Sequence, residues 1–250
     1  MAVAIYEFPL CEKVRNYLRL EQLFKQLKQV ESAKSDLQYL HFFKVLFDLI
    51  DLIERLDLRT DFIRDIEAQK KNLNHWAEHP DIDSAALELT VKGLNDLSAS
   101  IKNSKKLGAK IREEKFLSSI RQRFSIPGGA TSFDLPGLFY WLKQDQKYKT
   151  QCVKKWIGHL SVFDHTIQTL LEFLRARSQF SKVVGENGFY QGIVEDKLEL
   201  IRLKCEHQLG CYPVVSGNKY RYGIKFMLPE NEEQHAQPVA ESIDFEIACC

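Results

Sequence analysis

Two stretches of this chain contain the cysteine and histidine residues best suited to bind a metal ion. Cys205, His207 and Cys211 lie close together in the sequence, and the vicinal pair Cys249 and Cys250 ends it. Zinc sites usually draw cysteines from close pairs around a turn, whereas neighbouring residues on a strand point to opposite faces. We therefore expect no metal and no cofactor. Without secretory features, the six cysteines are interpreted as reduced thiols.

A catalytic site is the second kind of chemistry that the sequence could contain. His159 and His165 flank Asp164, but no Ser or Cys nucleophile accompanies them at a recognised spacing. The sequence also has no phosphate-binding glycine-rich loop, no Gly-x-Ser-x-Gly elbow and no His-Glu-x-x-His motif. These absences favour structural histidines, and we expect a protein that is not an enzyme.

The most distinctive motif places two arginines beside a rigid turn. Arg121 and Arg123 end a basic helical stretch, and the Pro-Gly-Gly sequence at 127–129 then favours a sharp reversal of the chain. We expect Asp134 to cap a helix whose first turn contains Pro136. Such a bend either forms a corner that recognises anions or acts as an elbow between helices, and residue chemistry alone favours the elbow.

This segment resembles the signature of the ZapD family, bacterial division proteins that bind the tubulin-like protein FtsZ. The resemblance rests on Arg-Gln-Arg-Phe-Ser-Ile-Pro-Gly-Gly followed by Ser-Phe-Asp-Leu-Pro. It covers the whole chain in family order, because further matching stretches lie at 6–10, at Lys13 with 18–21, at 187–191 and at 245–250.

The resemblance implies a non-enzymatic cell division factor of the cytoplasm, located at the mid-cell division site. As a homodimer it would cross-link and bundle FtsZ filaments and so stabilise the Z ring. Its partner segment would be the FtsZ carboxyl-terminal tail, which carries acidic and apolar residues, and we expect neither nucleic acid nor direct membrane binding. Basic residues of both domains would receive this tail, and we expect them to converge at the domain junction. They are Arg19, Arg55, Lys115, Arg121, Arg123, Arg221 and Lys225.

A basic-patch nucleic-acid-binding protein is the alternative function. Such a protein needs many cations along one face, with aromatic side chains for base stacking. Tyr220 and Tyr222 are candidates for stacking, but they lie on the strand face opposite Arg221 and Lys225. This parity indicates one core face and one charged face, which argues against the alternative.

Intramolecular ion pairs offer a plain structural interpretation of several cations. Arg221 and Lys225 could pair across strands with Asp244 and Glu246, provided that the two strands are neighbours. Two cations also have candidate partners on their own helices. They are Asp51 for Arg55, and Glu12 or Glu21 for Arg19.

The elements that must position these residues predict an α+β protein. A short strand at 2–8 precedes apolar residues that recur at helical spacing, and from Phe180 the apolar residues alternate instead. We expect an α-helical bundle domain at 10–178 and a mostly antiparallel β domain at 179–250, which the N-terminal strand joins. The apolar phase slips at Leu200, which predicts a bulge there.

The composition is that of an ordinary globular protein, with 44% hydrophobic and 28% charged residues. A formal net charge of +1 gives no global reason to expect a nucleic acid or an anionic membrane as partner. No uninterrupted apolar stretch approaches the length of a membrane span.

Overall fold

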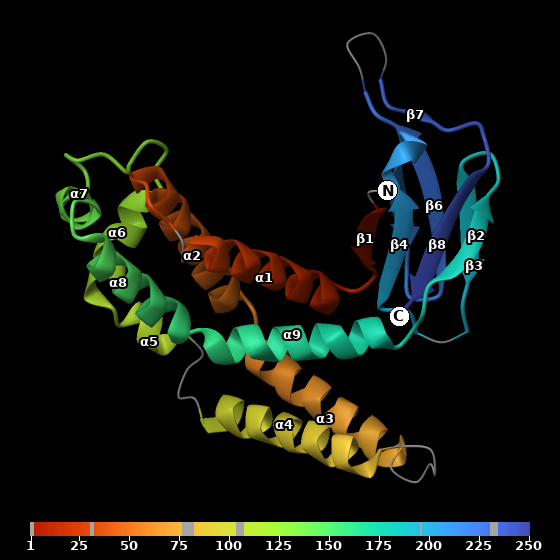
Figure 1. Ribbon diagram of the computed structural model, residues 1–250, viewed down its shortest axis with the longest axis horizontal. Helices are drawn as coiled ribbons and strands as arrows, with labels where there is room; N and C mark the ends of the chain where they lie inside the picture. The colour runs from red at the N-terminus through yellow and green to blue at the C-terminus, as the bar shows by residue number, and fades with distance from the viewer. Residues whose placement is uncertain (1–2, 31–32, 77–82, 104–107, 196, 231–234) are drawn as a thin grey trace. The chain divides into compact units, whose positions relative to one another are not determined.

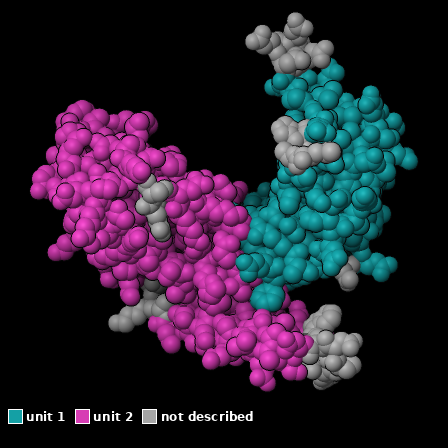
Figure 2. Space-filling view, in the orientation of Figure 1, with its two compact units in different colours: residues 1–18, 171–250 teal, residues 19–170 magenta. Residues whose placement is uncertain are grey.

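A computed structural model describes residues 3–30, 33–76, 83–103, 108–195, 197–230 and 235–250. Helices occupy the N-terminal part of the chain and antiparallel strands the C-terminal part, which confirms the α+β class (Figure 1). The chain forms two compact units, coloured separately in Figure 2. Unit 1 contains Met1–Leu18 and Leu171–Cys250, and unit 2 contains Arg19–Leu170.

Unit 2 is built from helices, and the ends of α1 and α9 extend into unit 1. The helices are α1 (Glu12–Gln29), α2 (Asp36–Arg55), α3 (Leu58–Trp76), α4 (Ser84–Asn103), α5 (Ala109–Arg112), α6 (Lys115–Phe124), α7 (Pro136–Leu142), α8 (Gln146–Gly158) and α9 (Ser161–Ala176).

Helix α2 is central to the packing of unit 2. A capping box fixes its start, because Ser35 Oγ accepts from the Gln38 N–H and the Gln38 side chain accepts from the Ser35 N–H. Its buried face packs against aromatic residues of later helices. The ring centroid of Phe43 lies 5.2 Å from that of Trp141 on α7 and 5.7 Å from that of Trp156 on α8. The basic helix α6 is thereby held beside α2 within one aromatic core.

Unit 1 contains two antiparallel sheets. Sheet A has the strand order β1-β4-β8-β2, and sheet B has the order β3-β6-β5, with β7 paired to β6. The pairing of β1 with β4 confirms that the N-terminal strand joins the β domain. The strands are β1 (Val3–Pro9), β2 (Ser181–Gly185), β3 (Phe189–Ile193), β4 (Leu200–Glu206), β5 (Tyr212–Gly217), β6 (Arg221–Leu228), β7 (Gln237–Pro238) and β8 (Ile243–Cys249).

One apolar cluster joins the inner faces of both sheets. Leu203 and Phe245 of sheet A and Ile224 and Phe226 of sheet B are buried members of it. Because alternate residues of a strand point to opposite faces, this core leaves the intervening residues of β6 on the outer face of sheet B. The alternation of β6 predicted from the sequence is confirmed.

The bulge predicted at Leu200 is wrong. The pairing of β1 with β4 runs without interruption from Val3 opposite Glu206 to Pro9 opposite Leu200. Leu200 and its neighbour Ile201 are both fully buried, although they point to opposite faces of the strand. Burial on both faces at the strand start explains the change of apolar phase.

Candidate functional site

The Pro-Gly-Gly segment forms the sharp reversal expected after α6. Gly128 has a φ of +74°, in the left-handed region that favours glycine. A Cβ added at Gly129 would lie 2.3 Å from the Arg123 carbonyl oxygen, so a side chain does not fit there. The Ile126 N–H donates to the same carbonyl at 3.0 Å. These contacts make the turn a rigid continuation of the basic helix.

Asp134 does not cap α7, contrary to the sequence prediction. The residue at the N-cap is Leu135, and Pro136 follows at the first helical position as expected. The Asp134 carboxylate instead accepts from Thr131 Oγ1 at 3.2 Å and lies 3.7 Å from Arg123 Nη1. Asp134 therefore braces the turn and pairs with one of the two motif arginines.

Arg121 is bound by carboxylates of α2. Its guanidinium donates to Glu54 at 2.8 and 3.1 Å and also to Asp51. The hydrogen bond with Glu54 raises the pKa of Arg121 and lowers the pKa of the Glu54 carboxyl. Arg112 adds a second cation 3.7 Å from Glu54. Arg121 is thus a neutralised member of a charge cluster that joins α2, α5 and α6.

A groove of about 630 Å³ lies over this cluster between α2 and α6. Phe47 and Phe124 contribute apolar surface to it, while Lys44, Asp48 and Asp51 contribute charges of both signs. With Arg121 already paired to Asp51, the groove has no surplus of positive charge to attract an acidic ligand. Arg121 is therefore a poor anchor for an acidic peptide.

The three other predicted site cations of unit 2 are exposed on separate helices. Arg19 lies on α1, Arg55 ends α2 and Lys115 begins α6. The expected pairing of Asp51 with Arg55 does not occur, because Asp51 binds Arg121 instead. Arg55 and Lys115 form no ion pair with the residues that the structure describes. The convergence of these cations with Arg221 and Lys225 stays a prediction, because those two belong to unit 1.

Arg221 and Lys225 lie on the outer face of sheet B. The expected cross-strand pairing with Asp244 and Glu246 is wrong, because β6 and β8 belong to different sheets. Glu246 is bound instead by Lys204 at 2.9 Å. Within the described residues, neither Arg221 nor Lys225 forms an ion pair. These two cations are about 13 Å apart along one strand face, from the rise per residue of a strand.

Apolar side chains surround this pair of cations. In the strand register, Phe189 of β3 and Val214 of β5 flank Lys225, and Ile193 of β3 lies opposite Arg221. All three apolar residues are exposed, by 46 to 82%. The Phe189 ring lies over Gly223, where an added Cβ would be only 3.3 Å from the ring. The outer face of sheet B thus combines unpaired positive charge with exposed apolar surface.

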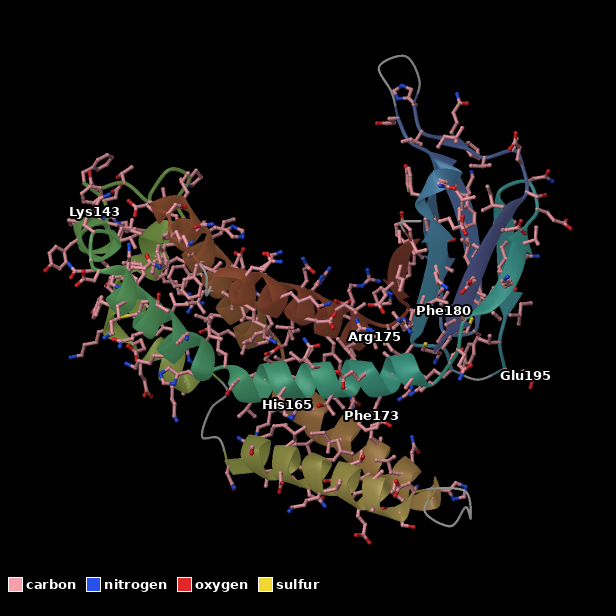
Figure 3. The ribbon with its side chains drawn as sticks, viewed as in Figure 1. Lys143, His165, Phe173, Arg175, Phe180 and Glu195 are labelled. Carbon is pink, nitrogen blue, oxygen red and sulfur yellow. The ribbon has the colours of Figure 1, made fainter. Side chains whose placement is uncertain are left out.

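Sequence reasoning missed the ion network that joins α9 to the β sandwich. Glu7 of β1 accepts from Arg175 of α9 at 2.7 and 2.8 Å and from Arg202 of β4 at 3.0 Å. Figure 3 labels Arg175 near the C-terminal end of α9. Glu7 lies within one of the family-like stretches, but no local spacing connects it to either arginine. The network has a structural role, because the Glu7 carboxylate holds both guanidinium groups and links α9 to β1 and β4.

Glu199 is the centre of a second ion network in unit 1. Its carboxylate lies 2.9 Å from Arg177 Nη1 and 3.4 Å from Lys13 Nζ. Burial alone would raise the pKa of Glu199, but Lys13, Arg177 and Lys197 outweigh it and hold the pKa below its usual range. The Glu199 carboxylate therefore links the start of α1 and the residue that follows α9 to the segment just before β4.

The cysteines are all free thiols. Cys249 Sγ lies 3.3 Å from the hydroxyl of Tyr222, and Cys250 is buried with its backbone paired to Leu200. Burial raises the pKa of the Cys205 thiol to about 11 and also raises that of Cys250. Protonated thiols are poor metal ligands and poor nucleophiles. The side chain of His207 lies outside the described residues.

We expect the double variant Cys249→Ser/Cys250→Ser to bind the predicted partner, the FtsZ tail, as tightly as the wild-type chain does. Serine preserves a polar partner for Tyr222 and replaces each sulfur atom with a smaller oxygen, so the cost is a modest loss of packing. Binding titration beside circular dichroism measures both effects. A folded double variant without binding would instead assign a function to these thiols.

His159 has a carboxylate neighbour rather than a nucleophile among its described contacts. Its Nε2 lies 3.6 Å from Glu114 Oε1, which Lys155 also contacts at 2.6 Å. Asp164, which the sequence places next to His165, forms an ion pair with Lys28 at 2.7 Å. These contacts support a structural role for His159 and Asp164.

No helix in the described part of the chain has both the length and the apolar character to cross a membrane.

Comparison with known proteins gives a consistent match along the chain. The family model ZapD, described as a cell division protein, matches residues 18–225. "Cell division protein ZapD" of Cronobacter sakazakii is 38% identical over 246 residues, which cover 98% of each chain. The protein of that name from Shewanella baltica is 36% identical over 250 residues, the full length of both chains. The one from Klebsiella pneumoniae is 37% identical over 248 residues, 98% of each chain.

Proposed function

Because this chain belongs to the ZapD family of cell division proteins, we propose that it binds the carboxyl-terminal tail of FtsZ and, as a homodimer, cross-links FtsZ filaments. In this proposal it acts without catalysis, in the cytoplasm at the mid-cell division site. It bundles the filaments and thereby stabilises the Z ring.

The outer face of sheet B is the observation that carries the proposal. Arg221 and Lys225 are exposed cations without a carboxylate partner among the described residues, and Phe189 and Val214 provide apolar surface beside them. A short tail with acidic and apolar residues complements both properties. Its carboxylates would pair with the two cations, and its apolar side chains would pack on Phe189 and Val214.

Weak single contacts are sufficient for such a cross-linker. A homodimer presents two copies of the sheet B face, and each FtsZ tail is tethered to its filament by a flexible linker. Binding of a second tail is then effectively intramolecular, so avidity exceeds the affinity of one site. This arrangement requires no enclosed pocket and no catalytic residue.

Cosedimentation with FtsZ filaments tests the proposal. We expect the wild-type chain to pellet with filaments and to bundle them, and to sediment alone as a dimer at micromolar concentration. FtsZ without its carboxyl-terminal tail is the matched control and should leave the chain in the supernatant. Pelleting with tailless filaments would reject the tail as the partner segment. Tighter binding of double-stranded DNA than of tail peptide at physiological salt would favour a nucleic-acid function instead.

A further inference from the structure

Helices α7 and α8 leave aromatic side chains exposed to water. Tyr140 is 71% exposed, and Phe139 and Tyr148 are 48% and 49% exposed. The same two helices bury Trp141 and Trp156, which pack on α2. Other residues therefore make the core contacts, and the exposed aromatic side chains are not needed to hold these helices in unit 2.

The exposed aromatic residues form one continuous face with a lysine. The Nζ atom of Lys143, which Figure 3 labels beside α7, lies 5.3 Å from the centroid of the Phe139 ring. Tyr140 and Tyr148 are neighbours across the two helices. A hydrogen bond with Cys152 is the main cause that raises the pKa of Tyr148, and the nearby Tyr140 hydroxyl raises it further. A continuous face of this kind, unlike a single exposed side chain, indicates a contact surface.

The segment that carries this face is positively charged, although the formal net charge of the whole chain is only +1. Residues 136–158 contain five lysines and one acidic residue, Asp145. Three of the lysines are already accommodated by the protein. Lys143 and Lys155 each bind a carboxylate, at 2.7 and 2.6 Å, and Lys149 is buried.

The two other lysines of the segment, Lys147 and Lys154, are exposed on α8. Neither forms an ion pair with the residues that the structure describes. Because they are seven residues apart, which is about two helical turns, both lie on the same side of α8. Tyr148 follows Lys147 directly, so the unpaired charge lies beside the aromatic residues.

We propose that this exposed face of α7 and α8 binds an anionic lipid bilayer. Lys147 and Lys154 lie beside the lipid phosphates in this contact, and Phe139, Tyr140 and Tyr148 enter the headgroup region, which aromatic side chains favour. Both helices keep their apolar sides in the core of unit 2, so only side chains enter the bilayer and the contact is shallow and reversible. The inference goes beyond the proposed function and replaces the expectation of no direct membrane binding.

A nucleic acid is the other polyanion that lysines and aromatic rings bind. Such binding depends on many phosphate contacts, whereas this face has only two cations unpaired among the described residues. The Lys143 ammonium also covers one side of the Phe139 ring, on which a base would stack. Phe133, in the turn that leads into α7, is 81% exposed and adds apolar surface without a hydrogen-bonding group. More apolar surface than free charge favours a lipid interface.

Vesicle cosedimentation of the full chain tests the inference. We expect the wild-type chain to pellet with vesicles of equal parts phosphatidylcholine and phosphatidylglycerol, and to stay in the supernatant with phosphatidylcholine alone. The double variant Lys147→Glu/Lys154→Glu replaces attraction to the lipid phosphates with repulsion, so its partition coefficient should fall at least about 10-fold. Lys71→Glu/Lys92→Glu is the matched control, because it makes the same change of charge at exposed lysines of α3 and α4. It should bind vesicles as the wild-type chain does.

Amide hydrogen exchange of the wild-type chain provides a test that does not depend on a variant folding. Anionic vesicles should slow exchange in the segment 130–158, while exchange in α3 should not change. Bound chain in which 130–158 gains no protection would place the lipid contact elsewhere and reject the proposed face.

The remaining outcomes separate the possible occupants of the face. A wild-type chain that does not pellet with anionic vesicles, or a folded Lys147→Glu/Lys154→Glu variant that pellets normally, would overturn the proposal and leave the filament cross-linker intact. Tighter binding of a single-stranded oligonucleotide than of anionic vesicles at the same salt concentration would assign the face to a nucleic acid. A variant that loses self-association in sedimentation velocity would assign it to a second copy of the chain, which also overturns the proposal.

Discussion

Reversing the charge of Arg221 should weaken binding of the FtsZ tail peptide about 10- to 100-fold, which corresponds to roughly 1.4–2.8 kcal/mol. Arg221→Glu replaces attraction to the acidic tail with repulsion, and Arg221 has no carboxylate partner in the described residues that this change would leave unpaired. We expect Lys225→Glu to act similarly, because Lys225 lies on the same face between Phe189 and Val214. Fluorescence anisotropy of a labelled peptide measures both.

Matched variants test whether the charge of Arg221, rather than the shape of its side chain, determines the affinity for the peptide. Lys182→Glu reverses an exposed cation of sheet A and should leave peptide affinity unchanged. Arg221→Gln removes the charge without adding repulsion and should fall between the wild-type chain and Arg221→Glu. Wild-type binding should weaken with added salt, since exposed charges are screened beyond about 8–10 Å near physiological ionic strength. Unchanged affinity in both Glu variants would exclude the sheet B face as the tail site.

The strand face on which Arg221 and Lys225 lie was predictable from the local sequence pattern alone. Period-two alternation in β6 places Tyr222, Ile224 and Phe226 on one face and the cations on the other, and the structure buries the first set. Strand neighbours were not predictable, because pairing depends on segments far apart in the chain. From the sequence, Glu246 could pair with either Lys225 or Lys204. In the structure it binds Lys204.

Ion pairs of the helical unit illustrate the same limit. Asp51 and Arg55 have the spacing of an intrahelical pair, yet Asp51 binds Arg121, which lies 70 residues away in the sequence. An isolated intrahelical pair contributes only a few tenths of a kcal/mol, so the packing of α6 beside α2 decides which partner Asp51 takes. Local spacing predicted the possible partners but not the tertiary contact that selects among them.

The paired state of Arg121 predicts a loss of stability rather than a selective loss of binding when its charge is reversed. Arg121→Glu would place a third carboxylate beside Asp51 and Glu54 and remove their shared cation. We expect the free energy of unfolding to fall by about 2–3 kcal/mol, after allowing for partial exposure of the cluster. For a unit of this size, that change lowers the Tm by roughly 5–10 °C, measurable by thermal circular dichroism.

Arg123→Glu is the natural control for this prediction, because it makes the same substitution on the same helix, two residues further along. Among the described residues its only carboxylate neighbour is Asp134 at 3.7 Å, and its side chain is 57% exposed, so we expect a loss below about 1 kcal/mol. The exchange Arg121→Glu/Glu54→Arg restores opposite charges and should recover much of the lost stability, since the two positions then attract again. If Arg121→Glu stayed as stable as the wild-type chain but lost peptide binding, Arg121 would be a binding residue and its pairing with α2 would be dispensable.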